Sequence, residues 1–259
     1  MAGWRHATLC AALIAVLGAP AATADVGRSA TVTPYRAGYV ATTLDPDVGT
    51  IYTRVSGTWK VPAVTCGRGD AGAVSRVWVG IGGYTTDLVI RAGTASNCDR
   101  SGRPSYAAWF DFGSTPDPQP AVRQTVAPGD TITATVNIVT QHLVRFELEN
   151  HTRHWSFHRD APHRVVDVSS AEWLVSAPSD CSSSGCSQPP LANFHLVRMS
   201  KLTAIGNGYT GNLFDGYWTV TPLRLVPPHS AGKAGAKPGP VANDGNSFGI
   251  SWIPVATAV

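Results

Sequence analysis

From Gly57 onward, short runs of alternating hydrophobic and polar residues follow one another, separated by residues that favour turns. Runs of this length with a period of two residues are typical of β-strands that bury one face. No segment has the longer period of an amphipathic helix. The pattern predicts an all-β fold, a sandwich or a barrel, and two packed antiparallel sheets would bury the alternating faces. The runs that predict strands are Gly57–Val64, Ser75–Ile81, Asp87–Ala92, Tyr106–Phe112 and Thr131–Val139.

Turn residues between these runs indicate antiparallel neighbours. Pro128-Gly129-Asp130 has the proline and glycine positions of a tight turn. Asn150-His151-Thr152 could turn a hairpin that joins Leu143–Glu149 to His154–His158. Near the end of the chain, Asn246–Pro254 alternates again, and we expect it to return to a sheet as a last strand.

The first residues have the composition of a secretory signal. Arg5 precedes an apolar run from Ala7 to Gly18, and the small residues Ala22–Ala24 suit a signal peptidase. We therefore predict a signal peptide over residues 1–24 and an exported, extracellular protein. No later stretch reaches the roughly 18 apolar residues of a membrane span, so no membrane association is expected.

The rest of the chain divides by composition into two parts, the second of which contains a distinct stretch. Residues 25–50 are small and polar and predict an extended N-terminal arm. Residues 51–259 suit one large β-domain. Within that domain, the stretch 228–245 is rich in proline, glycine, alanine and lysine, and we expect a mobile loop there.

The cysteines favour disulfide bonds. Cys10 would be removed with the signal, which leaves an even number in an oxidising compartment. Of the three possible connectivities, we favour Cys66 with Cys98 and Cys181 with Cys186, the second closing a tight loop of serine and glycine. A zinc site is the weaker alternative, because no CxxC pair is present.

Charge excludes some partners. The net charge is +3 and charged residues make up 14% of the chain, so neither nucleic acid nor an anionic membrane is expected as a partner. We expect a monomer.

Glu172 is the carboxylate that needs an explanation. It lies within the run from Ala171 to Val175, which is otherwise apolar and reads as a buried strand. An ionised carboxylate in such a strand costs several kcal/mol unless a partner compensates its charge. Two explanations are possible. Glu172 could point to solvent from an alternating strand, which is the commoner position of a lone glutamate. It could also be a catalytic carboxylate.

Histidines cluster in the predicted hairpin. The spacing of His151, His154, His158 and His163 invites a metal hypothesis, but no nearby inward acidic residue completes a ligand set. We favour a solvated strand face whose charge depends on pH, and we predict no metal and no cofactor.

Six motifs in one order resemble a known family. They are spread from about Gly57 to about Thr203, and together they resemble the glutamic peptidases, the eqolisins, in their bacterial secreted branch. The motifs are SRVWVGIGGY (75–84), LVIRAGT (88–94), YAAWFDF (106–112), VAPGD (126–130), SSAEWLVSAPS (169–179) and PLANF (190–194).

The resemblance implies a sandwich of two large antiparallel sheets, an architecture like that of concanavalin and related lectins. It also implies an endopeptidase that hydrolyses protein or peptide substrates at acid pH with a glutamate and a glutamine. The family glutamate is Glu172, which activates water as a general base and later protonates the leaving amine. Arg91 stands where the family has its glutamine. An arginine facing Glu172 would donate hydrogen bonds to an oxyanion, yet it would also pair with the carboxylate and lower its pKa.

The resemblance also implies substrate-binding residues. Trp78 and Trp109 match aromatic residues of the substrate groove, and Asp111 matches an acidic residue of the family. Either tryptophan could equally serve core packing. Because Arg91 and Glu172 could form a structural pair, an alternative function is a noncatalytic descendant that binds peptides or carbohydrate. A lectin-like sandwich that shares only the architecture is a third possibility.

Overall fold

The structure, a computed structural model, describes residues 1, 30–112, 121–163, 165–177, 180–182, 185–227 and 234–254. The predicted signal peptide over 1–24 lies outside these ranges except for Met1. The described residues include no helix long and apolar enough to cross a membrane.

Strands account for nearly all regular structure in the described residues. One short 3-10 helix, η1, covers Arg68–Asp70. The strands are β1 (Thr31–Thr33), β2 (Arg36–Thr43), β3 (Tyr52–Lys60), β4 (Val74–Gly82), β5 (Val89–Cys98), β6 (Pro104–Asp111), β7 (Ala121–Val122), β8 (Thr131–Thr140), β9 (Leu143–Asn150), β10 (Trp155–Pro162), β11 (Ser170–Ser176), β12 (Asp180–Ser182), β13 (Gly185–Ser187), β14 (Leu196–Gly206), β15 (Tyr209–Gly211), β16 (Trp218–Leu225), β17 (Ala234–Pro238) and β18 (Ser247–Pro254).

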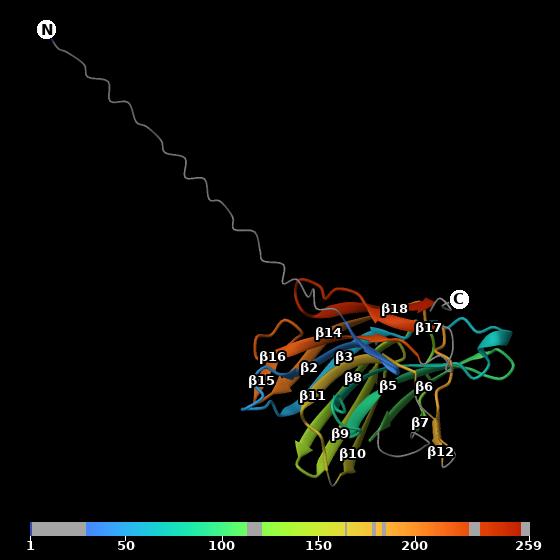
Figure 1. The fold of residues 1–259 in the computed structure, drawn as a ribbon, viewed down its shortest axis with the longest axis horizontal. Helices are drawn as coiled ribbons and strands as arrows, with labels where there is room; N and C mark the ends of the chain where they lie inside the picture. Colours follow the sequence, from blue (N-terminus) through green and yellow to red (C-terminus); the bar gives the residue numbers. More distant parts are fainter. Residues whose placement is uncertain are drawn as a thin grey trace.

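The strands form one continuous curled sheet (Figure 1). Its order is β10-β9-β8-β3-β14-β18-β17-β16-β2-β11-β4-β5-β6-β7, with β1 and β15 attached to β16 and β14, and a separate small sheet joins β12 to β13. The pairs within it are antiparallel except for β1 with β16. The all-β prediction is confirmed. The strands are linked by hydrogen bonds into one sheet, whereas the sequence predicted two.

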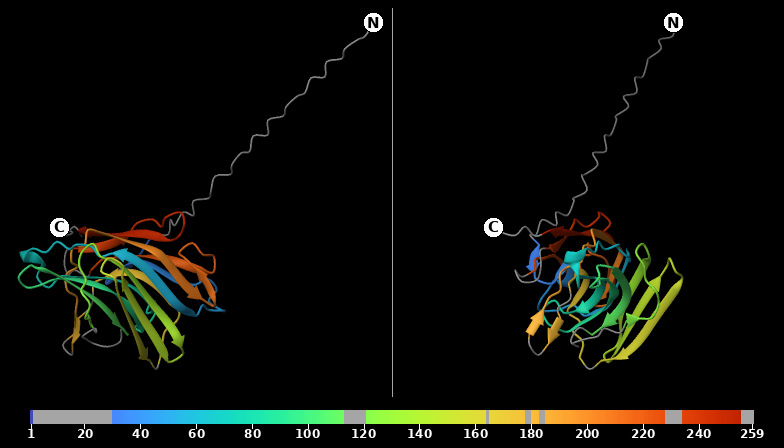
Figure 2. Two further views of the ribbon diagram at one scale, coloured as in Figure 1. Left: turned by 180° about the vertical axis from the view of Figure 1, so that it is seen from behind. Right: turned by 90° about the vertical axis from the view of Figure 1, so that its right-hand side faces the viewer.

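The sheet curls far enough for its two halves to pack on each other (Figure 2). Strands β3 and β8 of one half lie against β4, β5 and β11 of the other. The main hydrophobic core fills the space between them, with Trp59, Trp173 and Phe146 among its fully buried side chains. Burial of apolar area at about 25 cal/mol per Å² makes this layer the main source of stability.

The predicted N-terminal arm is in part a central strand. Residues 36–43 of the segment 25–50 form β2, which pairs with β11 on one side and β16 on the other. The prediction of an extended arm was wrong for these residues because it used their small and polar composition. Ala37, Tyr39 and Ala41 alternate toward the core, and this period marks a strand.

Three further predictions concern the loop 228–245, the hairpin and the last strand. Ala234–Pro238 lies within the predicted loop 228–245 but forms β17, paired with β18, so a loop throughout that stretch was wrong. Residues 228–233 lie outside the described ranges. The hairpin is confirmed, because β9 and β10 pair antiparallel across the turn 151–154. The last strand is confirmed as β18.

The disulfide between Cys66 and Cys98 is present. It ties the segment after β3 to the end of β5. Cys181 and Cys186 lie opposite each other in β12 and β13, but their side chains lie outside the described part of the structure, so their predicted bond stays a prediction.

Candidate active site

Glu172 lies in the middle of β11 on the face away from the main core. Its neighbours Ala171 and Trp173 point into that core, so strand alternation turns Glu172 to the other side. The side chain is nevertheless 0% exposed. Of the two positions that the sequence left open, a solvent-facing carboxylate and a buried one, the structure has the buried one.

Cross-strand pairing places the candidate residues in one row. Glu172 pairs with Gly80 of β4, Gly80 with Arg91 of β5, and Arg91 with Asp111 of β6. Directly opposite residues share a face of a sheet, so Glu172, Arg91 and Asp111 all project from this side. Gly80 has no side chain to separate Glu172 from Arg91, and a Cβ there would lie 2.7 Å from the Trp78 ring.

Arg91 binds Asp111 and not Glu172. Its Nε donates to Oδ1 of Asp111 at 2.8 Å and its Nη2 to Oδ2 at 3.1 Å. The predicted direct pair between Arg91 and Glu172 was therefore wrong. The physical reason is register, since Asp111 is the adjacent cross-strand partner of Arg91, whereas Glu172 lies two strands away.

The two tryptophans hold the Arg91 guanidinium in place. Its carbon lies 5.4 Å from the ring centroid of Trp78 and 5.5 Å from that of Trp109. Both rings are buried in a second, smaller hydrophobic cluster on the Glu172 side of the sheet, together with Leu174. They thus pack on the side of the candidate site and restrain its arginine.

Arg36 is the residue that the sequence did not suggest. It begins β2, and its Nη1 lies 3.3 Å from both carboxylate oxygens of Glu172. Its Nη2 donates a 2.8 Å hydrogen bond to the carbonyl oxygen of Gly83. Arg36 falls outside all six family-like motifs, and the pairing of β2 with β11 is what brings it to Glu172. The alternation of β2, read with Gly38 as a strand residue, was the signal that could have placed it on this face.

Burial controls the protonation of Glu172. Removal from water raises the pKa of Glu172 to about 7, although the positive charges of Arg36 and Arg91 act to lower it. The negative charge of Asp167 raises it slightly further. The sequence had led us to expect a lowered pKa, and the direction is opposite because desolvation outweighs the two arginines.

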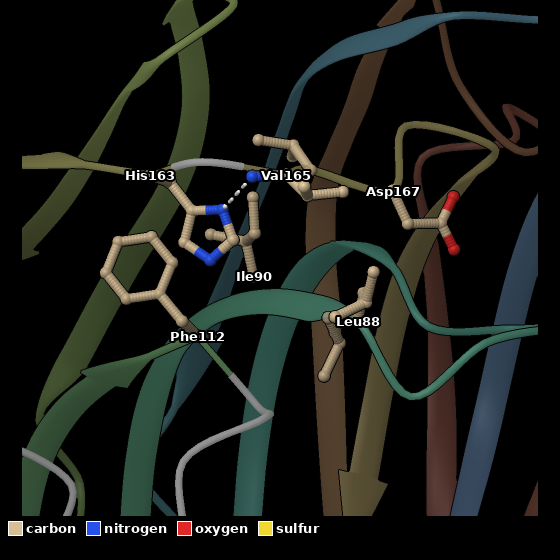
Figure 3. A pocket seen from close by; sticks show the side chains of 8 residues that line it. Leu88, Ile90, Phe112, His163, Val165 and Asp167 are labelled. Atoms are coloured by element: carbon tan, nitrogen blue, oxygen red, sulfur yellow. Dashed lines mark hydrogen bonds between the residues drawn. The ribbon is translucent and has the colours of Figure 1, made fainter.

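Asp167 joins the two loops at one end of the site. Its Oδ2 accepts hydrogen bonds from the Gly83 backbone at 3.1 Å and from Oγ1 of Thr86 at 2.6 Å. Burial acts to raise the pKa of Asp167, but these hydrogen bonds and those from Ser169 lower it overall. Figure 3 shows Asp167 at one end of a shallow apolar hollow, with Phe112 and His163 stacked at the other.

The clustered histidines do not meet. His151 bonds to Thr133 at 2.8 Å, His158 lies on β10, and His163 stacks on Phe112 with ring centroids 4.6 Å apart. Among the described residues, no group of three or more histidine, cysteine or acidic side chains could hold a metal ion.

Solved structures share this fold. Scytalido-glutamic peptidase with a peptide-based transition-state analogue matches at a TM-score of 0.68 and 20% identity, covering 86% of this chain and 100% of that one. SCP-B, an eqolisin in complex with the tripeptide Ala-Ile-His, matches at 0.66 and 20%, with the same coverage. Aspergilloglutamic peptidase from Aspergillus niger matches at 0.55 and 22%, covering 70% and 99%. At these identities the likeness shows the fold alone.

Sequence comparison carries the family assignment. Aspergillopepsin-2 of Aspergillus niger is 27% identical over 184 residues, which span 63% of this chain and 63% of that protein's length. The model of the peptidase A4 family matches residues 34–221, well over half of the chain. The resemblance drawn from the six motifs is thus confirmed, and this chain belongs to the peptidase A4 family of glutamic peptidases.

Proposed function

We propose that this protein is an endopeptidase of the glutamic type that hydrolyses protein or peptide substrates, with Glu172 as its general base and acid. The observation that carries the proposal is the buried Glu172 carboxylate with its pKa raised to about 7, in a chain of this family. A pKa near neutrality suits a group that must both accept and return a proton.

In the proposed reaction, the ionised Glu172 takes a proton from a water molecule as that water attacks the substrate carbonyl carbon. The same carboxyl group then protonates the leaving amine. Arg91 would stabilise the oxyanion. Its Nε and Nη2 are engaged by Asp111, so Nη1 is the nitrogen that would donate to the oxyanion. Stacking on Trp78 and Trp109 holds this donor still, which is what electrostatic stabilisation of a transition state requires.

The pKa of Glu172 shifts the expected pH range. With a pKa of about 7, only roughly 1% of Glu172 is ionised at pH 5. The rate of a base-catalysed step would therefore rise with pH toward 7. The acid pH that the resemblance implies would hold if substrate binding lowers this pKa.

The test is hydrolysis of unfolded casein by the purified protein from about pH 3 to pH 8, beside a Glu172→Gln variant that keeps the side-chain shape. We expect cleavage by the wild type, with an ascending limb near pH 7, and none by the variant. No cleavage at any pH, or equal cleavage by both proteins, would contradict the proposal.

A second candidate is a peptide- or carbohydrate-binding protein without catalysis. One observation favours it: Glu172 is fully buried and paired with Arg36, so the carboxylate of the resting protein is not open to water. An Arg91→Gln/Asp111→Asn variant distinguishes the two, because it introduces the glutamine that the resemblance implies and also neutralises the aspartate that loses its hydrogen bonds from Arg91. Hydrolysis by this variant together with none by the wild type would indicate that the natural protein binds without catalysis.

The proposed setting is extracellular. The predicted signal over 1–24 and the disulfide between Cys66 and Cys98 both support export to an oxidising compartment. Mass spectrometry of the secreted protein would locate its first residue, which we expect after Ala24.

A further inference from the structure

Arg36 lies on the solvent side of Glu172. The Arg36 side chain is 23% exposed, whereas that of Glu172 is 0% exposed. On β2 the next position on the same face is Gly38, and a Cβ there would collide with the Trp173 carbonyl oxygen and with Leu174, so Gly38 allows β2 and β11 to lie close together beside Glu172. Arg91 is 19% exposed, so a substrate that approaches Glu172 from solvent would meet the guanidinium groups of Arg36 and Arg91.

The contacts of Arg36 occupy the positions that a reacting water would need. Its Nη1 is equally close to both oxygens of Glu172, at 3.3 Å each. A general base must lie within hydrogen-bond reach of the water that it activates. Because Glu172 has no exposed surface, neither a water nor a peptide can take that place while Arg36 stays.

Other charged groups around Glu172 are more firmly held. Arg91 has two hydrogen bonds to Asp111 and two tryptophan rings against it. Asp167 is bound by the loop that begins at Gly83. Among the described residues, the hydrogen bonds of the Arg36 guanidinium go to Glu172, at a long distance, and to the Gly83 carbonyl. Arg36 thus differs from Arg91 in that its hydrogen bonds to a carboxylate are longer, 3.3 Å against 2.8 and 3.1 Å.

We propose that Arg36 is a cover on the Glu172 carboxylate, closed in the resting protein and withdrawn when a substrate peptide enters. This inference rests on the proposed peptidase function for its purpose, but the cover itself can be tested without activity. A closed state competes with substrate, so the apparent affinity equals the affinity of the open state multiplied by the fraction of molecules that are open.

Access to Glu172 can be measured with a water-soluble carbodiimide and glycine methyl ester at pH 7, followed by peptide mass mapping. The glutamates of the chain are Glu147, Glu149 and Glu172, so the other two report the general reactivity of the sample. We expect Arg36→Ala to raise the rate of labelling at Glu172 about tenfold or more. Loss of the Arg36 charge also favours the protonated, reactive carboxyl, but a group with a pKa of about 7 is already half protonated, so this effect is at most about twofold.

A matched control is Arg145→Ala, which removes another arginine bound to a carboxylate, with hydrogen bonds of 2.6 and 2.8 Å to Asp160 in the opposite half of the sheet. It should leave the labelling of Glu172 unchanged. Arg36→Lys keeps the charge and should give an intermediate rate, and it also serves if Arg36→Ala fails to fold. Labelling of Glu172 at the wild-type rate in folded Arg36 variants would overturn the proposal.

Kinetics separate this cover from a role in the chemistry. With casein as substrate, Arg36→Ala should lower KM, because the closed state is lost. The kcat on the plateau of the pH profile, where Glu172 is ionised in both proteins, should stay within about twofold. A fall in kcat of about a hundredfold would instead assign Arg36 to the reaction itself and overturn the cover. If the wild type cleaves nothing, the proposed function fails, while the labelling rates still decide whether Arg36 covers Glu172.

Discussion

Arg91 and Asp111 are directly opposite each other on β5 and β6, and the arginine makes a two-point contact with the carboxylate at 2.8 and 3.1 Å. The Asp111 side chain is 3% exposed. The sequence had suggested that Arg91 would contact Glu172, but Arg91 contacts Asp111. This contact leaves Arg91 as a fixed positive charge beside the candidate base, and it shows how the structure accommodates an arginine where the resemblance implied a glutamine.

Loss of Arg91 should therefore destabilise the fold. Arg91→Gln removes the charged partner of a buried aspartate, and we expect the free energy of unfolding to fall by about 3 kcal/mol. Adding Asp111→Asn should recover most of that loss, because an amide is less costly to bury than a carboxylate. Urea unfolding at pH 7 measures both. Equal stability of the single and double variants would show that the pair does not contribute.

Glu172→Gln should separate activity from folding. The substitution removes the proposed general base, and we expect casein hydrolysis to fall at least about a hundredfold. At the same time a neutral amide of the same shape replaces a buried charge, so the melting temperature at pH 7 should stay the same or rise. Melting followed by circular dichroism measures the stability, and the casein assay measures the activity. A variant that is inactive because it is unfolded would not support the assignment.

Stability should fall as pH rises from about 4.5 to 7. The pKa of Glu172 is about 7 in the folded protein and near 4.5 when unfolded, so between these values the folded state holds a proton that the unfolded state has released. This contribution is complete below pH 4.5 and is lost toward pH 7, by about 3 kcal/mol in total.

The control for this pH dependence is the same Glu172→Gln variant, whose free energy of unfolding should not fall in this way between about pH 4.5 and pH 7. The lowered pKa values of Asp130, Asp160 and Asp167 act in the other direction and only below about pH 4, where these groups become protonated. Guanidinium unfolding at several pH values measures the difference. Identical slopes in both proteins would contradict the raised pKa.

The disulfide between Cys66 and Cys98 should matter for stability. It closes a loop with a sequence separation of 32, for which loop entropy predicts about 4 kcal/mol of stabilisation. We expect a Cys66→Ala/Cys98→Ala variant to unfold at a correspondingly lower urea concentration. A change below about 1 kcal/mol would mean that the native structure offsets the entropic gain.

Local patterns were enough for part of the site. The motif around Glu172 identified the catalytic candidate, and the motif around Arg91 identified the departure from glutamine. Both predictions rest on short sequence motifs, in which only neighbouring residues along the chain are compared. The pairing of Cys66 with Cys98 also followed from counting and spacing, and the structure has it.

Partners across strands were not readable in the same way. Asp111 was recognised as a site residue, but its contact with Arg91 depends on the register of β5 with β6. The sequence placed Arg36 in an arm, because its segment is small and polar, although residues 36–42 of β2 pair with β11. A one-residue change of register would turn these side chains to the other face.

The sequence by itself determined the all-β class and the family, and it singled out Glu172 as the candidate catalytic residue, because strand period, turn residues and motif order are local properties of the chain. The tertiary structure decided what surrounds Glu172: Arg36 above it, Arg91 held away by Asp111, and no access to water. It thereby also decided the direction of the Glu172 pKa, because desolvation depends on how completely the folded chain encloses the carboxylate.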